Sequence, residues 1–473
     1  MSFALVSSHW LSLHGLAIVV GLLVYVVTSH VQQQRRHPSA AIGWVLFMLL
    51  VPYVALPLYL LFGTRKLPHA GCSSPNIRVS NLQDDKSTWP AQLIAALGQP
   101  PLTTYRSLRI HADGFQSLHA LLEVIDGAQH TLDVCTFILG RDALGGAVGA
   151  RLMARVRDGV QVRLLLDGVG RLLGGTSDLP ALERAGVQIG LFMPPIHSPM
   201  KGRTNLRNHR KLVVADAGHA AERLWSGGRN LAAEYFEGKG GRPAWRDLSF
   251  DLQGHLARQA ANLFQQDWIF ATGAKAGAAR PILKANISPI TTASGEPVAQ
   301  IIASGPDQAD DTVHALLVSA AYHASKRIAL VSPYVVLDNA LLLGLTMAAR
   351  RGVQVDLLLP LRSNHRLADI ARHRSLRALT GAGVRIWLAP QMLHAKLAIF
   401  DDVLALAGSA NLDSRSLFLN YELMVAFESA SDVMRYTTWF DLERSSACLY
   451  VSQPPGLWRD LGEGLVLWLG FQL

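Results

Sequence analysis

The chain has 473 residues, of which 50% are hydrophobic and 17% charged, with a formal net charge of +9. This length and apolar content exclude a disordered or fibrous chain and predict about three domains. Its 3 cysteines lie far apart without a CxxC pair, which argues against a disulfide framework or a cysteine-based zinc site. The positive balance suits an anionic partner, either nucleic acid or acidic phospholipid.

Two apolar stretches near the N-terminus predict a helical hairpin in a membrane. Residues 40–62 carry no formal charge, and they are long enough to cross a hydrocarbon core of about 30 Å. Residues 11–27 form a shorter run, which we expect to be a second span rather than a re-entrant or interfacial segment. Arg35 and Arg36 would lie in the turn. Basic residues flank both sides of the second stretch, so charge gives no orientation.

The rest of the chain consists of one unit written twice. Residues 157–166, RDGVQVRLLL, are echoed by residues 350–359, RRGVQVDLLL, and further landmarks follow in the same order. Such order indicates an internal duplication. Each copy alternates helical stretches with short runs of Val, Ile and Leu, which is typical of buried parallel strands with crossover helices. The predicted fold is α/β, with two duplicated domains related by approximate two-fold symmetry and half-sites that face each other.

These patterns set the expected domain boundaries. We expect a membrane hairpin over residues 1–64, linkers over 65–104 and 276–297, domains over 105–275 and 298–455, and an apolar tail over 456–473. The tail is too short to span a membrane, and it would be either core or an interfacial patch.

Each copy ends in the same polar motif, H-x-K-x4-D followed by G-[SG]-x-N. The motif residues are His209, Lys211, Asp216 and Asn230 in the first copy, and His394, Lys396, Asp401, Ser409 and Asn411 in the second. A single His-x-Lys on a strand would usually be solvated surface, and a single Gly-Ser a turn. Matching positions at the same place in both copies instead predict a catalytic site.

The residue types in this motif suit phosphodiester exchange. Two imidazoles can supply a nucleophile and an acid/base, so that the exchange proceeds through a phosphohistidine. Alternation along a strand would place the His and Lys of each motif on one face. Lys211 and Lys396, with Asn230, Asn411 and Ser409, would hold the phosphoryl oxygens. This chemistry calls for no metal and no cofactor.

Asp216 and Asp401 complete the two motifs and are counted with the catalytic set. We nevertheless expect their carboxylates to anchor local structure or form salt bridges rather than to act in the chemistry.

The doubled motif resembles the signature of the phospholipase D superfamily, and the whole arrangement resembles bacterial cardiolipin synthases. The similar blocks are residues 208–211, 227–235, 245–247, 332–334, 393–396 and 408–416. The resemblance implies phosphatidyl transfer from one phosphatidylglycerol to another with release of glycerol. It also implies a multi-pass protein of the inner membrane, with its catalytic domains on the cytoplasmic side.

The resemblance further implies roles for single residues. His209 would be the nucleophile and His394 the acid/base, while Glu422 and its repeat partner Asp247 would orient the imidazoles. Two features depart from the family pattern. The first copy has a longer stretch between its Asp and its glycines, which a loop between two strands would explain, and Arg229 would place a cation beside the site.

Two basic clusters fit a lipid substrate, although either could also be a solvated face. They comprise Lys201, Arg203, Arg207, Arg210 and Lys211 in the first copy, and Arg362, Arg366, Arg372, Arg374 and Arg377 in the second. Cations near a membrane attract anionic headgroups.

Three other functions remain open from the residues alone. A nuclease could use the same two histidines, but the membrane hairpin and the lack of aromatic residues among the cations argue against a nucleic-acid partner. A hydrolytic phospholipase D would differ only in using water to resolve the intermediate. A non-catalytic membrane scaffold would predict decay of one motif copy, and both copies are intact.

Overall fold

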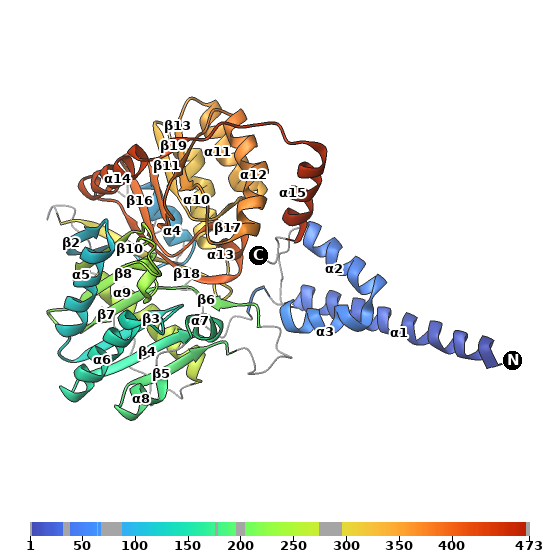
Figure 1. The fold of residues 1–473 in the computed structure, drawn as a ribbon, viewed down its shortest axis with the longest axis horizontal. Coiled ribbons are helices and arrows are strands. Elements are labelled where there is room, and N and C mark those ends of the chain that lie inside the picture. Colours follow the sequence, from blue (N-terminus) through green and yellow to red (C-terminus); the bar gives the residue numbers. More distant parts are fainter. Residues whose placement is uncertain are drawn as a thin grey trace.

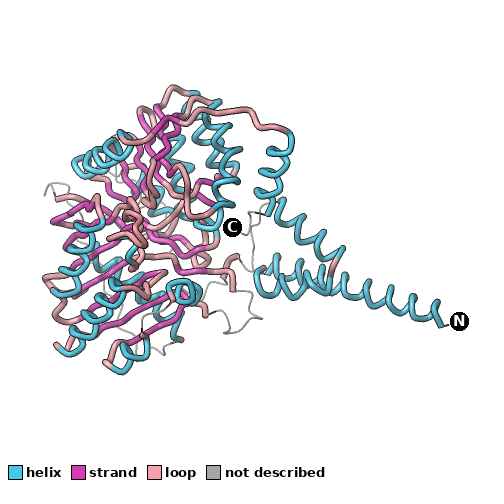
Figure 2. Tube along the Cα trace, viewed as in Figure 1, coloured by secondary structure: helices cyan, strands magenta, loops and turns pink. Residues whose placement is uncertain are grey.

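The computed structural model describes residues 2–31, 38–63, 65–67, 88–175, 178–194, 204–273 and 296–469. Figure 1 shows two α/β domains with N-terminal helices that project to one side, and Figure 2 shows strands inside each domain with helices around them. The expected turn at Arg35 and Arg36, half of the first linker and nearly all of the second lie outside the described residues.

The N-terminal region forms α1 (Ser2–Val31), α2 (Pro38–Leu50) and α3 (Pro52–Phe62). Within the described residues, the segment Ser12–Ser29 of α1 is the one helical stretch long and apolar enough to cross a membrane. Residues 40–62 do not form one continuous helix, because proline at 52 lacks an N–H and is best placed in a first turn. The run expected to be the shorter span is therefore the longer helix. Thr28 Oγ1 lies 2.7 Å from the Tyr59 hydroxyl, which joins α1 to α3.

The first domain contains a mixed sheet in the order β2-β9-β8-β7-β3-β4-β5. These strands are β2 (Arg106–His111), β9 (Ser249–Gln253), β8 (Arg223–Gly227), β7 (Leu212–Ala215), β3 (Thr131–Thr136), β4 (Gln161–Asp167) and β5 (Gln188–Phe192). Its helices are α5 (Gly114–Asp126), α6 (Ala143–Arg157), α7 (Gly168–Gly174), α8 (Leu179–Arg184), the short 3₁₀ helix η3 (Ala233–Tyr235) and α9 (Leu256–Thr272).

The second domain repeats this plan in a sheet of order β1-β10-β18-β16-β15-β11-β13-β14-β19. These strands are β1 (Thr103–Thr104), β10 (Val298–Ser304), β18 (Asn420–Phe427), β16 (Leu404–Gly408), β15 (Leu397–Phe400), β11 (Arg327–Val331), β13 (Gln354–Pro360), β14 (Arg385–Ala389) and β19 (Cys448–Leu449). A small separate sheet pairs β12 (Val335–Val336) with β17 (Leu412–Asp413). The helices are α10 (Thr312–His323), α11 (Asn339–Arg350), α12 (Arg366–Gly381), α13 (Ser414–Phe418), α14 (Ala430–Ser445) and α15 (Leu457–Leu469).

The expectation of parallel strands holds for only part of each sheet. Strands β3, β4 and β5 are parallel, as are β11, β13 and β14. The strands that follow each His-x-Lys, β7 and β15, run antiparallel to β3 and β11. Apolar content indicates burial on both faces but does not give strand direction, which explains the error. Because of this reversal, β7 and β15 begin at the edge where the parallel strands end.

The repeated Gly-Val pairs end helices as the sequence predicts. Gly159 and Gly352 follow α6 and α11 with φ of +84° and +90°. Glycine adopts this left-handed conformation without a steric penalty, which allows the chain to turn into β4 and β13.

Part of the first expected linker is structured. Helix α4 (Trp89–Ala96) buries Ile94 in the core of the second domain, and β1 pairs with β10. This segment therefore packs on the second domain before the chain enters the first.

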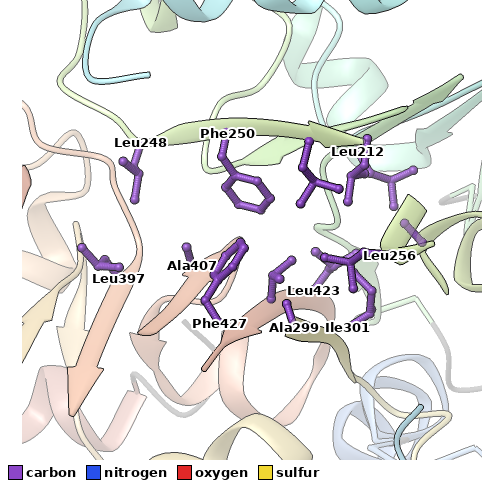
Figure 3. Close-up of a cluster of buried hydrophobic side chains, with 14 of the residues drawn as sticks. Leu212, Leu248, Phe250, Leu256, Ala299, Ile301, Leu397, Ala407, Leu423 and Phe427 are labelled. Carbon is purple, nitrogen blue, oxygen red and sulfur yellow. The ribbon is translucent and has the colours of Figure 1, made fainter. Parts of the chain in front are cut away.

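The two domains share a hydrophobic core where their sheets meet. Figure 3 shows Leu212 and Phe250 of the first sheet facing Ala407, Leu423 and Phe427 of the second. In β7, alternate residues point to this shared core and to a separate core under α5 and α6, so the whole strand is buried. The extensive apolar contact makes the domains one unit.

Candidate active site

Each histidine of the doubled motif lies on a segment that pairs with the other domain. The short strand β6 (Arg207–Asn208) runs parallel to β18, and the His209 N–H donates to the Tyr421 carbonyl at 2.9 Å. In the second copy, the His394 N–H donates to the Arg246 carbonyl at 2.6 Å. This reciprocal pairing brings each histidine beside an acidic residue of the opposite domain.

The two imidazoles are therefore oriented across the domain interface. His209 Nδ1 lies 3.0 Å from both carboxylate oxygens of Glu422. His394 Nδ1 lies 2.7 Å from Asp247 Oδ2. Both acids are fully buried. The sequence resemblance predicted Glu422 and Asp247 as orienting acids, and the structure places them in contact with the histidines.

Both orienting acids have lowered pKa values despite their burial. Burial alone would raise the pKa of Asp247, but His394, Lys396 and Arg229 outweigh it and hold that pKa at about 2. The pKa of Glu422 is lowered in the same way, where burial is outweighed by His209, Lys211 and the Ser409 hydroxyl. Both carboxylates are thus ionised acceptors for an imidazole N–H.

Ser409 and Gly228 occupy matching positions in the two copies. The orienting acids, Glu422 and Asp247, explain why one position is serine and the other is glycine. Ser409 Oγ donates to Glu422 at 2.5 Å, and Ser416 Oγ donates to it at 2.6 Å. In the first copy a Cβ at Gly228 would lie 2.3 Å from Asp247 Oδ1, so a serine does not fit there. Ser409 Oγ thus lies against Glu422 and outside the lining of the cavity, and its contact with a phosphoryl oxygen stays a prediction.

The two lysines lie next to their own histidines. Lys211 Nζ donates to the His209 carbonyl at 2.7 Å, while Lys396 Nζ lies 2.8 and 3.0 Å from the two ring nitrogens of His394. Burial lowers the pKa of Lys211 to about 8 and that of Lys396 to about 7. Burial, and then Lys396, lower the pKa of His394 to about 3. Burial also lowers the pKa of His209. With these pKa values, Lys211 is mostly protonated at neutral pH, Lys396 is partly protonated and His394 is neutral until an anion binds.

Both half-sites open onto one cavity of about 410 Å³. His209, His394, Asn230 and Asn411 all line it, as the duplicated motif predicts. Asn230 Nδ2 donates to the Tyr235 hydroxyl at 2.8 Å. In the described part of the chain, the buried Oδ1 atoms of Asn230 and Asn411 have no hydrogen-bond partner. Buried polar atoms in this condition are poised to bind a substrate group.

The sequence missed several residues of this cavity. Its wall also includes Phe137, Tyr334, Asn364, His365, Asp413 and Arg415, in addition to Arg207 of the first basic cluster. Tyr334, Asp413 and Arg415 fall in blocks that carried the family resemblance, so those blocks held a usable signal. Asn364 and His365 follow β13 without any motif, although Tyr334 donates to Asn364 at 2.5 Å. Burial raises the pKa of Asp413 to about 6.

Several predicted cations serve the fold instead of forming open patches. Arg229 donates to the carbonyls of Tyr235 and Asp247, so it supports the acid from behind and does not line the cavity. Arg210 is fully buried and pairs with Asp267. Arg372 donates to the carbonyls of residues 360 and 361, and burial lowers its pKa. Lys201 and Arg203 lie outside the described residues.

The longer spacing in the first copy is a loop between two strands, as expected. β7 and β8 pair antiparallel, and residues 217–222 form turns between them. This loop lies at the end of β7 opposite to His209.

Asp216 and Asp401 hold the far ends of β7 and β15. The Asp216 carboxylate accepts the backbone N–H groups of residues 129–131, and Asp401 accepts those of residues 325–327. Both residues have positive φ, at 52° and 50°. Neither lines the cavity. The structure gives these carboxylates the anchoring role expected from the sequence.

We expect the Asp401→Ala variant to unfold more easily while keeping its activity per folded molecule. Loss of the backbone acceptor should lower the free energy of unfolding by about 1–2 kcal/mol. Burial raises the pKa of Asp401, but the backbone N–H donors outweigh burial, so the pKa is lowered. The stabilisation is therefore present above the unfolded pKa of about 4, and it is lost as the pH falls through the lower folded pKa. Thermal unfolding at pH 7 checks this, with Asp402→Ala as the control. Inactivity at unchanged stability would instead place Asp401 in the chemistry.

Comparisons with known proteins agree with this architecture. A family model described as "Cardiolipin synthase, PLD-like domain" matches residues 121–268 and 317–443, and one described as "Phospholipase_D-nuclease N-terminal" matches residues 17–63. The first model matches twice, which confirms the duplication.

Curated relatives match over most of the chain. Cardiolipin synthase A of Pseudomonas putida (strain W619) is 30% identical over 424 residues, which are 86% of each chain. Cardiolipin synthase 1 of Bacillus anthracis is 28% identical over 449 residues, covering 90% of this chain and 87% of the relative. The crystal structure of phosphatidylserine synthase from Haemophilus influenzae Rd KW20 has a similar fold, with a TM-score of 0.62 and 12% identity over 82% of this chain and 100% of that one.

Fold and site together define a membrane-associated enzyme with duplicated phospholipase D-like domains. The chain belongs to the cardiolipin synthase family, and its activity is that of a phosphatidyltransferase.

Proposed function

We propose that this protein transfers a phosphatidyl group from one phosphatidylglycerol to the terminal hydroxyl of another, through a phosphohistidine at His209. The observation that carries the proposal is the pair of histidines on one cavity, each held at Nδ1 by a carboxylate of the opposite domain. An imidazole held in this way keeps its Nε2 for chemistry.

The exchange takes two balanced steps. In the first, His209 Nε2 attacks phosphorus, the bond from phosphorus to the glycerol oxygen breaks, and His394 gives its proton to that oxygen. In the second, the hydroxyl of another phosphatidylglycerol attacks phosphorus, its proton passes to His394, and the bond to Nε2 breaks. The products are cardiolipin and glycerol. General acid–base help of this kind is worth about 10²–10⁴-fold.

The contacts favour His209 as the nucleophile. Within the described residues the Nε2 of His209 has no hydrogen-bond partner, whereas both ring nitrogens of His394 lie near Lys396 Nζ. A nucleophile needs a free lone pair, and an acid needs a site whose protonation changes with the ligand. The negative charge of a bound phosphate would raise the pKa of His394, so that its imidazole takes up a proton from water and can give it to the leaving glycerol.

Phosphate charge would be balanced from both halves of the cavity. Lys211 and Lys396 lie beside the histidines, and Arg207 and Arg415 line the same wall. Burial lowers the pKa values of both lysines, so their full charge is regained as the anionic substrate binds. Asn230 and Asn411 add neutral hydrogen-bonding groups, which can hold phosphoryl or glycerol oxygens.

Purified full-length protein in mixed micelles with headgroup-labelled phosphatidylglycerol is expected to yield cardiolipin and free glycerol. A His394→Ala sample should yield no cardiolipin, and at most the single glycerol per protein molecule that is released when the adduct at His209 forms. Phosphatidic acid as the sole lipid product would show that water resolves the intermediate and that the protein is a hydrolase. Absence of lipid turnover together with salt-sensitive cleavage of DNA would overturn the proposal in favour of a nuclease.

We also propose that α1 and the α2–α3 pair both cross the inner membrane, with the catalytic domains on the cytoplasmic side. α2 and α3 together approach the length of a span, and Tyr59 of α3 contacts α1. Cys448 is exposed on the second domain and Cys135 is buried, so a Cys72→Ser protein carries one reporter thiol for the catalytic side. An impermeant maleimide applied to spheroplasts is expected to leave Cys448 unlabelled until the membrane is opened. Labelling of intact spheroplasts would reverse the orientation.

A further inference from the structure

Helix α15 packs against its domain by its charged face. Asp460 pairs with Arg374 and Arg377 of α12, and Glu463 pairs with Arg377 at 2.6 Å. The opposite face is apolar and open: Trp458 is 84% exposed and Leu461 is 55% exposed. A helix on a water-soluble surface shows the reverse arrangement, with apolar residues inward. An apolar face turned outward is typical of helices that lie in a membrane interface.

A second apolar surface surrounds the mouth of the cavity. We define the apolar rim as Leu172 and Leu173 of α7 with Leu367 and Ile370 of α12, all of which are exposed. Leu173 lines the cavity itself, and Ala368 and Ala371 beside the α12 residues also line it. The rim therefore consists of residues from one helix of each domain, and both helices lie at the opening of the cavity. It shares α12 with the docking site of α15.

The membrane segment is fixed to the wall of the same cavity. Directly after α3, Arg65 and Lys66 pair with Asp311 at 2.9 and 2.8 Å. The Arg65 guanidinium also lies over the ring of Phe418, 4.5 Å from its centre. Phe418 ends α13, the helix whose Ser414 and Arg415 line the cavity. The end of the apolar N-terminal region thus contacts α13, the same short helix that lines the cavity.

Figure 1 agrees with this arrangement, because α15 lies in that view on the side of the catalytic domains from which α1, α2 and α3 project. Arg362 and Arg366, next to the rim, are exposed and carry positive charge. Cations beside an apolar patch suit a surface of anionic lipids. Continuity with the membrane helices and this charge both identify the occupant as a lipid bilayer.

We propose that the apolar rim and the open face of α15 rest in the surface of the bilayer that α1 enters, so that the cavity opens directly onto lipid. A cavity of about 410 Å³ is of the size that holds a drug-sized molecule, and two acyl chains exceed it. Only the headgroup enters, and the acyl chains stay in the bilayer along the leucines of the rim. This last step rests on the proposed function, whereas the position of the surface does not.

Nitroxide labels on the full-length protein test the position of the surface. The background is Cys72→Ser with Cys448→Ser, and buried Cys135 is retained. Labels are placed by Leu172→Cys, Leu367→Cys and Trp458→Cys, with Met434→Cys and Leu442→Cys on α14 as matched controls that are also exposed. In proteoliposomes of phosphatidylglycerol and phosphatidylcholine, accessibility to oxygen and to a water-soluble nickel chelate reports depth.

The three test positions are expected to favour oxygen over the nickel chelate, and the two controls to favour the chelate. Chelate-accessible labels at 172 and 367 would overturn the proposal, as would spin–spin broadening that showed a second copy on this surface. These outcomes do not depend on catalysis, so they stand even if the proposed function fails.

An activity measurement adds the functional consequence. The Leu172→Asn/Leu367→Asn protein is compared with Leu442→Asn on phosphatidylglycerol in bilayers and on short-chain phosphatidylglycerol below its micelle concentration. We expect the ratio of bilayer to monomer turnover to fall at least about tenfold in the rim variant alone, a loss equivalent to about 1.4 kcal/mol. An unchanged ratio would overturn the role of the rim, and a parent protein inactive on both substrates would refute the proposed function instead.

Discussion

The His209→Ala and His394→Ala variants are expected to form cardiolipin at least about 10⁴-fold more slowly than the parent protein. Each variant removes one of two groups that the exchange requires. One histidine cannot take both roles, because an Nε2 bonded to phosphorus cannot also donate the proton that the leaving glycerol needs. Product formation from labelled phosphatidylglycerol measures the loss. His119→Ala is the control, since His119 is exposed on α5 of the first domain.

The two variants should differ in a covalent adduct. Only a protein that retains His209 should carry a labelled phosphatidyl group after rapid acid-free denaturation, so the adduct is expected in His394→Ala and absent in His209→Ala. The phosphorus–nitrogen bond would make this label labile to acid. Adduct in His209→Ala and none in His394→Ala would reverse the two roles.

Removing the negative charge of either orienting acid should cost about 10³–10⁴-fold in turnover. In Glu422→Gln and Asp247→Asn the amide can present an N–H to Nδ1 and so favour the wrong imidazole tautomer. KM should change less than kcat, because neither acid lines the cavity. Steady-state kinetics on the two variants measure both quantities.

Glu428→Gln provides a matched control for this experiment. Glu428 follows the last residue of β18, the strand that carries Glu422, and it accepts a hydrogen bond from Thr88 away from the histidines. A loss confined to KM in Glu422→Gln would mean that the carboxylate acts on substrate binding and not on the imidazole. Equal losses in Glu428→Gln would indicate a general effect on the strand.

The sequence predicted which residues form the site because the duplication repeats their chemistry. His209, Lys211 and Asn230 recur in order as His394, Lys396 and Asn411, and glycines at 159 and 352 mark equivalent helix ends. Such patterns depend on local backbone conformation and side-chain type, and the local sequence indicates both. The two anchoring aspartates followed from the same motif.

The sequence could not predict the exchange of acids between domains, since that depends on how β6 meets β18 in space. The direction of β7 and the break between α2 and α3 were missed because apolar content alone does not distinguish these alternatives. The motif predicts that Ser409, with the lysines and asparagines, holds the phosphoryl oxygens. Its actual partner, Glu422, is distant in the motif and adjacent only in the fold.

The reciprocal pairing of histidines and acids has a consequence for the order in which this protein becomes active. The apolar helix α1 leaves the ribosome long before residue 422 is made, so it can reach the membrane while the chain is still growing. Until then His209 has no carboxylate to hold it, and the first domain alone contains half of each catalytic pair. On the proposed mechanism, a chain that lacks the second domain would be inert. Transfer could begin only once the second domain, which carries Glu422 and His394, has folded against the first.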